Sequence, residues 1–298
     1  MHISVQSSRT ILFEMLRSYT ALAHTRNLSE AVEMLGSTRQ TVRRHIGTLE
    51  EIRGEKLFEM RNRQYCLTEA GLRSLKEAES ILARGEAWLA GGLADSDGLP
   101  LVRDAGEDGP ALFAQQHRVS RLWVDQSPLL QCGLRCWANA NAAIESDELA
   151  MIRPYLVVYR RHGQGWLCVE IGEKSSYASW FGWAWAKSNV GRTVQEMPAG
   201  AGYARFISQA YQSVFEGHSV RLDHMHTEMP RERDGPCVPV SFQRLLLGCT
   251  FPDGEFALAL LVDRTYKLTI AGVGEERIRT MPESLLMAFE PNSIEAQE

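Results

Sequence analysis

The sequence has few of the features that mark an exported or membrane-embedded protein. Its six cysteines are scattered through 298 residues, and it has no uninterrupted apolar run of the roughly 20 residues that a bilayer span needs. The first residues carry no cationic region followed by an apolar stretch, and Glu14 interrupts the apolar run that begins at Ile11. We therefore expect no signal peptide or membrane span, reduced cysteines and a cytoplasmic location.

Sequence motifs of the common enzyme classes are also missing. There is no phosphate-binding loop with a lysine, no nucleophile-elbow glycine pattern and no closely spaced set of metal ligands. The enzymatic alternative is a cysteine-dependent reaction with Cys237 as nucleophile and His224 or His226 as base. Because no motif fixes that geometry, we expect no enzyme activity and assign neither a metal nor a cofactor.

The charge is small overall and unevenly distributed. The formal net charge is −5, with +2 in residues 1–92 and −7 in the remainder. Only the N-terminal part is therefore suited to approach a phosphate backbone.

Residues 27–58 have the pattern of two short helices joined by a tight turn. Asn27 suits an N-cap, and Glu30 stands where it would complete a capping box. Gly36 is placed to end the first helix, and Ser37 or Thr38 to cap the second. Apolar residues then recur at helical spacing and should face inward: Val42, Ile46 and Leu49.

The opposite face of the second helix is basic and polar. Its outward residues are Arg39, Gln40, Thr41, Arg43 and Arg44. Guanidinium groups suit guanine edges or phosphates, an amide suits adenine, and threonine suits thymine or phosphate. The alternative is that Arg43 and Arg44 belong to an ordinary solvated surface.

Residues 57–67 predict a small hairpin after this helix. Asn62 suits its turn, and Tyr65 and Leu67 alternate as in a strand. Arg61 and Arg63 on its sides would lie beside a DNA backbone and add affinity without sequence information.

This order of residues resembles the DNA-binding domain of LysR-type transcriptional regulators over about residues 11–92. The resemblance implies a winged helix-turn-helix that contacts double-stranded DNA through Arg39, Gln40, Thr41, Arg43 and Arg44. Gln40 stands where the family usually has proline, and Met60 where it has a basic residue. The matching positions are Ala31, Leu35, Val42, Ile46, Leu49, Glu50, Gly54, Leu57, Phe58, Leu67, Thr68, Ala70 and Gly71.

A long amphipathic helix should follow the winged domain. Residues 68–89 contain no proline and carry an apolar stripe. Family members use this helix to form dimers, so we expect a homodimer, with a tetramer assembled from two dimers as a further option. The alternative is that the stripe packs on the chain's own second domain.

The domain boundaries follow from these patterns. We assign residues 1–68 to the winged helix-turn-helix and 69–92 to the linker helix. Residues 93–110, rich in Asp and Gly, are expected to form a flexible linker. The second domain then spans 111–290.

The second domain departs from the alternating strands and helices of a typical LysR-type effector domain. Strand-like runs at 154–160 and 166–171 are followed by helical patterns at 176–187 and 202–215. Three further strands are predicted at 219–229, 238–251 and 255–263, and a helix at 128–144. This order resembles a PAS domain, a five-stranded antiparallel sheet with short helices around a sensory cavity.

Three groups of residues are candidates for sensing. The aromatic run from Tyr177 to Trp185 could line a pocket for a planar or apolar ligand, or be plain core packing. His224 and His226 should leave one face of a strand, where they could bind a metal or serve as hydrogen-bonded histidines. Cys132 and Cys136 should lie on adjacent turns of a helix, which suggests redox sensing.

We therefore expect an α+β protein in which a winged helix-turn-helix and a linker helix precede a PAS-like domain. Its expected function is that of a sequence-specific, dimeric transcriptional regulator in which a signal, a small-molecule ligand among the candidates, alters the dimer. The alternative is a small-molecule-binding or cysteine-dependent enzyme domain fused to a winged helix used for protein interaction.

Overall fold

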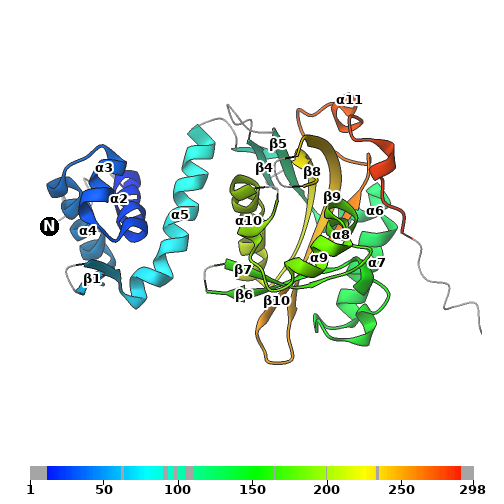
Figure 1. Cartoon of the computed structure of the whole chain (residues 1–298), viewed down its shortest axis with the longest axis horizontal. Helices are drawn as coiled ribbons and strands as arrows, with labels where there is room; N and C mark the ends of the chain where they lie inside the picture. The colour runs from blue at the N-terminus through cyan, green and yellow to red at the C-terminus, as the bar shows by residue number, and fades with distance from the viewer. Residues whose placement is uncertain are drawn as a thin grey trace, which may run out of the picture. The chain divides into compact units, whose positions relative to one another are not determined.

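The chain forms two compact units. The computed structural model describes residues 12–61, 64–89, 93–96, 99–104, 111–163, 165–198, 200–232 and 235–289. Internal contacts divide the chain into Met1–Ala90 and Gly91–Glu298 (Figure 1). Asn62, the expected turn residue of the hairpin, and Arg63 lie outside the described residues.

The described residues of the N-terminal unit form four helices and one hairpin. These are α2 (Leu12–Thr25), α3 (Leu28–Leu35), α4 (Arg39–Arg53), β1 (Phe58–Arg61), β2 (Gln64–Leu67) and α5 (Glu69–Leu89). In the hairpin Phe58 pairs with Leu67 and Arg61 with Gln64. The predicted inward residues of α4 are buried: Val42, Ile46 and Leu49. The two-helix motif and the hairpin are therefore confirmed.

The helix ends follow the sequence with two adjustments. Asn27 caps α3 by accepting the Ser29 N–H, but its side-chain amide donates to Glu30 at 2.7 Å, so Glu30 does not reach the backbone. Gly36 ends α3 in the left-handed region at φ 57°. Thr38, not Ser37, caps α4 through the Thr41 N–H.

The junction between the hairpin and α5 is closely packed. The Thr68 hydroxyl donates to Lys56 O and accepts the Gly71 N–H, which caps the new helix. A Cβ on Gly71 would lie 2.3 Å from the backbone oxygen of Leu57. Only glycine fits at this point without moving the main chain.

Helix α5 uses part of its apolar stripe within its own unit. Ala78 and Leu82 are buried in the N-terminal core, and α5 packs against α2. Ile81 and Leu89 keep 45% and 71% of their surface exposed. One part of the apolar stripe is therefore buried within the N-terminal unit, and another part is exposed.

The C-terminal unit is organised around an eight-stranded sheet. Its strands are β3 (Leu93–Ser96), β4 (Leu99–Asp104), β5 (Leu112–His117), β6 (Val157–His162), β7 (Gly165–Ile171), β8 (Val220–Pro230), β9 (Cys237–Thr250) and β10 (Phe256–Arg264). The spatial order is β3-β4-β5-β8-β9-β10-β6-β7, with every pair antiparallel. The five strands expected from the sequence are adjacent to one another.

Two sequence-based interpretations of this unit were wrong. Residues 93–104, expected to form a flexible linker, contain β3 and β4, because pairing of β4 with β5 and of β3 with β4 overrides their polar composition. Residues 111–117, for which no strand was predicted, form β5 inside the sheet. The sheet accordingly has three strands more than the predicted five.

Helices cover both faces of the central strands. Alternate residues such as Tyr159 and Val158 enter two separate cores. The first core includes residues of α8 (Ser176–Phe181), α9 (Trp183–Asn189) and α10 (Gly200–Gly217). The second includes residues of α6 (Leu122–Asp125) and α7 (Pro128–Asn139). The helix predicted at 176–187 is divided at Gly182, whose φ is 91°.

Short elements complete the unit and protect one sheet edge. They are η1 (Val119–Arg121), η2 (Asp147–Leu149), η3 (Arg153–Tyr155), η4 (Val194–Glu196), α11 (Glu275–Ile278) and η5 (Glu283–Leu285). Along β7, the Cys168 N–H donates to Arg192 O and Cys168 O accepts the Gly191 N–H. Leu167 also forms a bridge with Thr193. The segment before η4 thus covers the outer edge of β7.

The close approach at Gly71 gives a stability prediction. Gly71→Ala should destabilise the N-terminal unit by about 1–3 kcal/mol, because the added carbon meets a backbone atom rather than a movable side chain. Gly47→Ala is the matched control, since its Cβ has no atom within 4 Å and alanine favours a helix interior by about 0.5–1 kcal/mol. Amide hydrogen exchange of α2 in the full chain measures both, and equal effects would contradict the packing argument.

Candidate nucleic-acid interface and a buried cavity

The polar face of α4 is exposed as the sequence predicts. Arg39, Gln40, Arg43 and Arg44 are exposed, and Thr41 is half-buried. Two of these side chains are held in place. Arg39 donates to the Ser29 hydroxyl at 2.8 Å, and the Thr41 and Thr38 hydroxyls are 2.9 Å apart. The start of α4 therefore presents an ordered set of donors.

Glu50 connects α4 to the hairpin, a role that the sequence analysis did not assign. Its Oε1 accepts the N–H groups of Leu57 and Phe58 at 2.9 and 3.2 Å. Its Oε2 is 2.6 Å from Lys56 Nζ. Because the Glu50 side chain is buried, these bonds fix where β1 starts relative to α4.

A second buried polar residue connects α4 to α2. His45 Nδ1 lies 2.8 Å from the Ser18 hydroxyl of α2. Burial and the neighbouring Arg44 lower the pKa of His45. The periodicity of α4 could have placed His45 on the inner face, but its partner on α2 is 27 residues away in sequence.

The hairpin contributes one described basic side chain. Arg61 is 70% exposed and forms an ion pair with Glu59 at 2.6 Å. Exposed pairs of this kind contribute about 0–1 kcal/mol, so phosphate can compete for the guanidinium. Arg63 lies outside the described residues.

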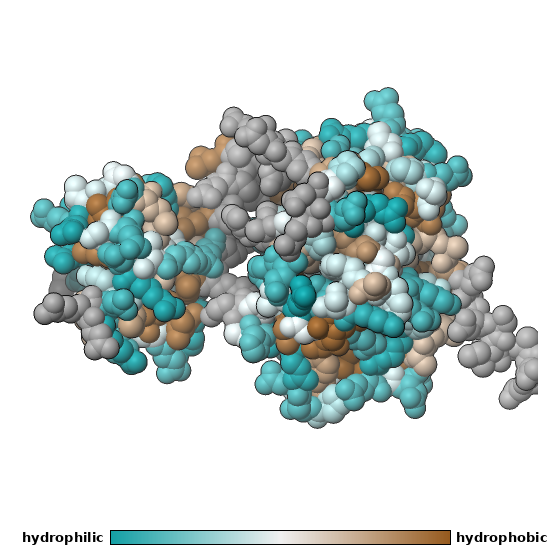
Figure 2. Space-filling model, viewed as in Figure 1, coloured by the Kyte–Doolittle hydropathy of each residue, from teal (hydrophilic) through white to brown (hydrophobic). Residues whose placement is uncertain are grey.

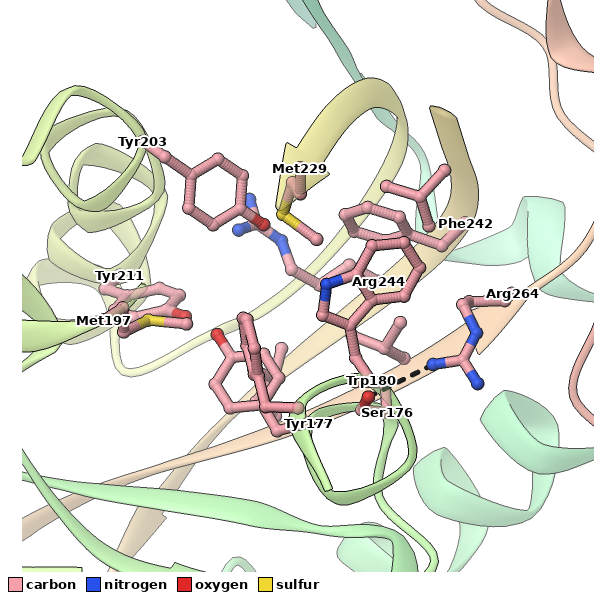
Figure 3. Close-up of a pocket in the computed structure, with 14 residues that line it drawn as sticks. Ser176, Tyr177, Trp180, Met197, Tyr203, Tyr211, Met229, Phe242, Arg244 and Arg264 are labelled. Carbon is pink, nitrogen blue, oxygen red and sulfur yellow. Dashed lines mark hydrogen bonds between the residues drawn. The ribbon is translucent and has the colours of Figure 1, made fainter. Parts of the chain in front are cut away.

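The C-terminal unit contains a small cavity between the sheet and its helices. Its volume is about 30 Å³, more than the roughly 10–15 Å³ that one water molecule needs. Apolar and aromatic side chains form most of its wall: Tyr177, Trp180, Phe181, Met197, Tyr203, Tyr211, Met229, Val240, Phe242, Leu260 and Val262. Ser176, Arg244 and Arg264 complete it, with Arg264 on the opposite side from the tyrosines in Figure 3.

Charged groups at the cavity are compensated in two different ways. Arg244 donates through Nε and Nη2 to Asp223 Oδ2 at 3.2 and 2.7 Å. Although burial opposes it, Arg221 and Arg244 hold the pKa of Asp223 below its usual value. The bonds of Arg264 instead go to uncharged oxygens: Leu285 O, Ser176 O and Ser179 Oγ. Burial and the nearby Arg231 lower the pKa of Arg264 to about 10.

The tyrosine hydroxyls near this cavity are under-satisfied. Burial raises the pKa values of Tyr159 and Tyr177 well above the ordinary range, and each hydroxyl lies close enough to affect the other. Within the part of the chain that the structure describes, the Tyr159 and Tyr211 hydroxyls have no well-formed hydrogen bond. A water molecule or a ligand atom in the cavity would provide one for Tyr211, which lines it.

The predicted aromatic run is divided between the cavity wall and core packing. Tyr177, Trp180 and Phe181 line the cavity, while Trp183 is 42% exposed. Phe181 and Trp185 pack with ring centroids 4.4 Å apart. The break at Gly182 separates the cavity-lining part from the exposed part.

His224 and His226 share one face of β8 but have separate partners. His224 accepts the Thr269 N–H, and its Nε2 is 3.1 Å from Asp125. Its ring also lies 4.1 Å from that of His117. His226 is 2.9 Å from the Ser241 hydroxyl. In the described residues no three His, Cys, Asp or Glu side chains form a metal-binding group.

The cysteine-dependent alternative does not assemble a catalytic pair. Cys237 is exposed and pairs with Pro230 across the strands, four residues beyond His226. At about 3.3 Å per residue, this separates them by about 13 Å. Cys132 and Cys136 lie together on α7, as the spacing predicts, with both thiols free.

On the face shown in Figure 2 the surface is mostly hydrophilic, with hydrophobic colour limited to patches. None of the helices that the structure describes combines the length and apolar character of a bilayer span.

Comparison with known proteins identifies the N-terminal motif. Residues 13–72 match the family described as bacterial regulatory helix-turn-helix protein, lysR family. This segment is therefore a LysR-type helix-turn-helix DNA-binding domain. No curated protein matches the chain significantly.

Several solved structures match the same part of the chain. Oxidised OxyR from Corynebacterium glutamicum has 25% identity and a TM-score of 0.26, over 26% of each chain. The CbnR DNA-binding domain in complex with DNA has 29% identity and a TM-score of 0.24, over 26% of this chain and 95% of that one. The BenM DNA-binding domain with catB site 1 DNA has 23% identity and a TM-score of 0.25, over 26% and 88%. The match thus spans about a quarter of the length of the OxyR chain.

The buried histidines predict a pH-dependent stability of the C-terminal unit. Burial, with the adjacent His224, lowers the pKa of His117 to about 4, and burial with Arg277 lowers that of His226 to about 4. The unfolded chain therefore binds more protons between pH 6.5 and 4, so stability falls as the pH drops through this window. From pH 7 to pH 5 each histidine should remove about 2 kcal/mol.

Urea unfolding followed by tryptophan fluorescence at pH 7 and pH 5 measures this loss. His226→Gln should remove about half of the stability loss that the two histidines cause between pH 7 and pH 5. An unfolding midpoint that is the same at both pH values would contradict the prediction.

Proposed function

We propose that this protein is a sequence-specific, DNA-binding transcriptional regulator of LysR type whose C-terminal unit senses a signal. The observation that carries the proposal is the ordered basic face of α4 in a segment that matches the lysR family. Regulation of transcription in the cytoplasm, without enzyme activity, is the function that suits this combination.

The DNA-contacting side chains have distinct roles in this proposal. Arg39, Gln40 and Thr41 at the start of α4 read base edges in the major groove. Arg43, Arg44, Arg61 and Arg63 bind phosphates and set affinity and register. The hydrogen bond that Arg39 donates to the Ser29 hydroxyl orients the Arg39 side chain before DNA binds. Four of the five guanidinium N–H groups of Arg39 stay available for DNA.

The proposal includes a homodimer formed through α5. Ala78 and Leu82 of the apolar stripe are buried in the N-terminal core. Ile81 and Leu89 of the same stripe are exposed. A second copy of α5 would bury this exposed part. Two copies would also place two α4 helices on a two-fold related operator.

The sensory role rests on the arrangement of the C-terminal unit. Five adjacent antiparallel strands, with α8, α9 and α10 between β7 and β8, have the PAS-like element order. Strands β3 to β5 and the α7 layer are additions to it. The cavity with under-satisfied tyrosines is a candidate ligand site.

Substitutions on the two DNA-contacting elements should separate specificity from affinity. Arg39→Ala should relax discrimination at one base position by about 1–3 kcal/mol. Arg61→Ala should weaken binding to all sequences alike and lower the salt slope by about one. Operator selection from the source genome, followed by binding titrations at several salt concentrations, measures both effects.

The control is Arg279→Ala, an arginine of the C-terminal unit that is 58% exposed. It should change neither base preference nor salt slope. The variants Arg43→Ala and Arg44→Ala test the alternative. If both variants keep the DNA affinity of the wild type, the winged domain binds a protein instead, and the proposal fails.

A change in the cavity wall should alter how the dimer sits on DNA. Trp180→Ala removes a buried wall side chain and is expected to change the length or bend of the operator footprint. Trp183→Ala is the matched control, because that ring is exposed and outside the cavity lining. Footprinting of folded variants, checked by circular dichroism, gives the comparison. Identical footprints for wild type and Trp180→Ala would overturn the sensory role of this cavity.

A further inference from the structure

Three sulfur atoms converge on the C-terminal unit at a place that the proposed function does not use. Cys132 and Cys136 lie one turn apart on α7, with their Sγ atoms 3.8 Å apart. The Sδ atom of Met151, which follows η2, lies 3.4 Å from the Sγ of Cys132. Two separate elements thus bring two thiols and a thioether together.

The spacing of the two cysteine sulfurs matches that of atoms sharing one metal ion. With metal–sulfur bonds of about 2.3 Å, two sulfurs are about 3.8 Å apart in tetrahedral and about 4.0 Å apart in trigonal coordination. The 3.8 Å separation of Cys132 and Cys136 equals the tetrahedral value, whereas the 3.4 Å separation of Cys132 and Met151 is shorter, so the Met151 thioether would move outward on binding. A disulfide would need about 2.05 Å, and both cysteines are free thiols.

The chemistry of the three ligands selects the metal. Thiolate and thioether are soft ligands that favour monovalent copper, and a thioether is not among the usual zinc ligands. In the described residues no histidine or carboxylate joins these cysteines in a metal-binding group. An ion that prefers carboxylate or imidazole ligands would therefore gain no such ligand at this cluster.

The position of the cluster allows a metal to enter. Met151 is 41% exposed, and both cysteines are half-buried. On the inner side of the helix, Leu129, Leu130 and Gly133 pack on the sheet, so the backbone that carries the thiols is held in place. Such preorganisation favours binding, because little side-chain order has to be created.

We propose that Cys132, Cys136 and Met151 form a site for Cu(I) in three-sulfur coordination. Binding replaces the two thiol protons, which leave to solvent, and involves no change in oxidation state. A bound ion would join α7 to the segment between η2 and η3. The proposal revises the sequence-based expectation of no metal and holds whether or not the protein binds DNA.

The opposing factors at the site are also visible. Burial and the neighbouring Cys132 raise the pKa of Cys136 to about 11. A thiol with a raised pKa is a poor nucleophile, which disfavours the redox hypothesis that the sequence suggested.

The test is an anaerobic titration of the full-length, reduced protein with Cu(I) in competition with bathocuproine disulfonate. One Cu(I) per chain is expected, with thiolate-to-copper charge-transfer absorption in the ultraviolet. X-ray absorption should show three sulfur neighbours at about 2.3 Å. Preference for Zn(II) over Cu(I), or more than one metal per chain at equal affinity, would overturn the proposal.

Variants distinguish this site from adventitious thiol binding. The double variant Cys132→Ser/Cys136→Ser should lose the site, and Met151→Leu should weaken it by roughly tenfold or more, since even supporting groups around a metal have effects of that size. Cys237→Ser is the matched control, an exposed thiol elsewhere in the unit, and should bind as wild type does. Unchanged affinity in the double variant or in Met151→Leu would overturn the three-sulfur site.

Discussion

The carboxylate of Glu50 is the interaction on which the geometry of the DNA-binding unit depends. It accepts two backbone N–H groups at the start of β1 while it stays part of α4. Leaving such buried donors unpaired costs about 1–3 kcal/mol each. The hairpin that carries Arg61 and the helix that carries Arg39 are therefore placed by one side chain. Thr68 and Gly71 then set where α5 leaves the unit.

The C-terminal unit depends on a different constraint, burial of its central strands on both faces. Strands β9 and β10 are almost wholly buried, so each carries apolar residues at successive positions rather than at every second one. Polar groups inside this region need specific partners. Asp223 has Arg221 and Arg244, and Arg264 has three uncharged oxygens. These partners determine the shape and polarity of the cavity wall.

The sequence was most informative where the pattern is local. Caps, periodicity and turn residues predicted α3, α4, the hairpin and the strands β6 to β10 to within a few residues. The exposure of Arg39, Gln40, Arg43 and Arg44 followed from the same helical period. Strands β3 and β4 were missed because their stability comes from pairing of β3 with β4 and of β4 with β5 rather than from their own composition. Gly182 was not recognised as a helix break inside an aromatic run.

The site features that were missed are contacts between residues distant in sequence. Met151 meets Cys132 across 19 residues, and His117 meets His224 across more than a hundred. Pattern analysis identified Cys132, Cys136, His224 and His226 as candidates but could not supply their third partners. The two residues that brace α4, His45 and Glu50, likewise act through atoms on other elements.

The cover over β7 has a consequence for behaviour at high concentration. An open strand edge is a template onto which another chain can add a strand, the route by which sheets grow into aggregates. Main-chain bonds to Arg192 and Gly191 already occupy that side of β7. Self-association at this edge would first require those bonds to break. Two copies of the chain therefore associate more easily through symmetric contacts elsewhere on the molecule.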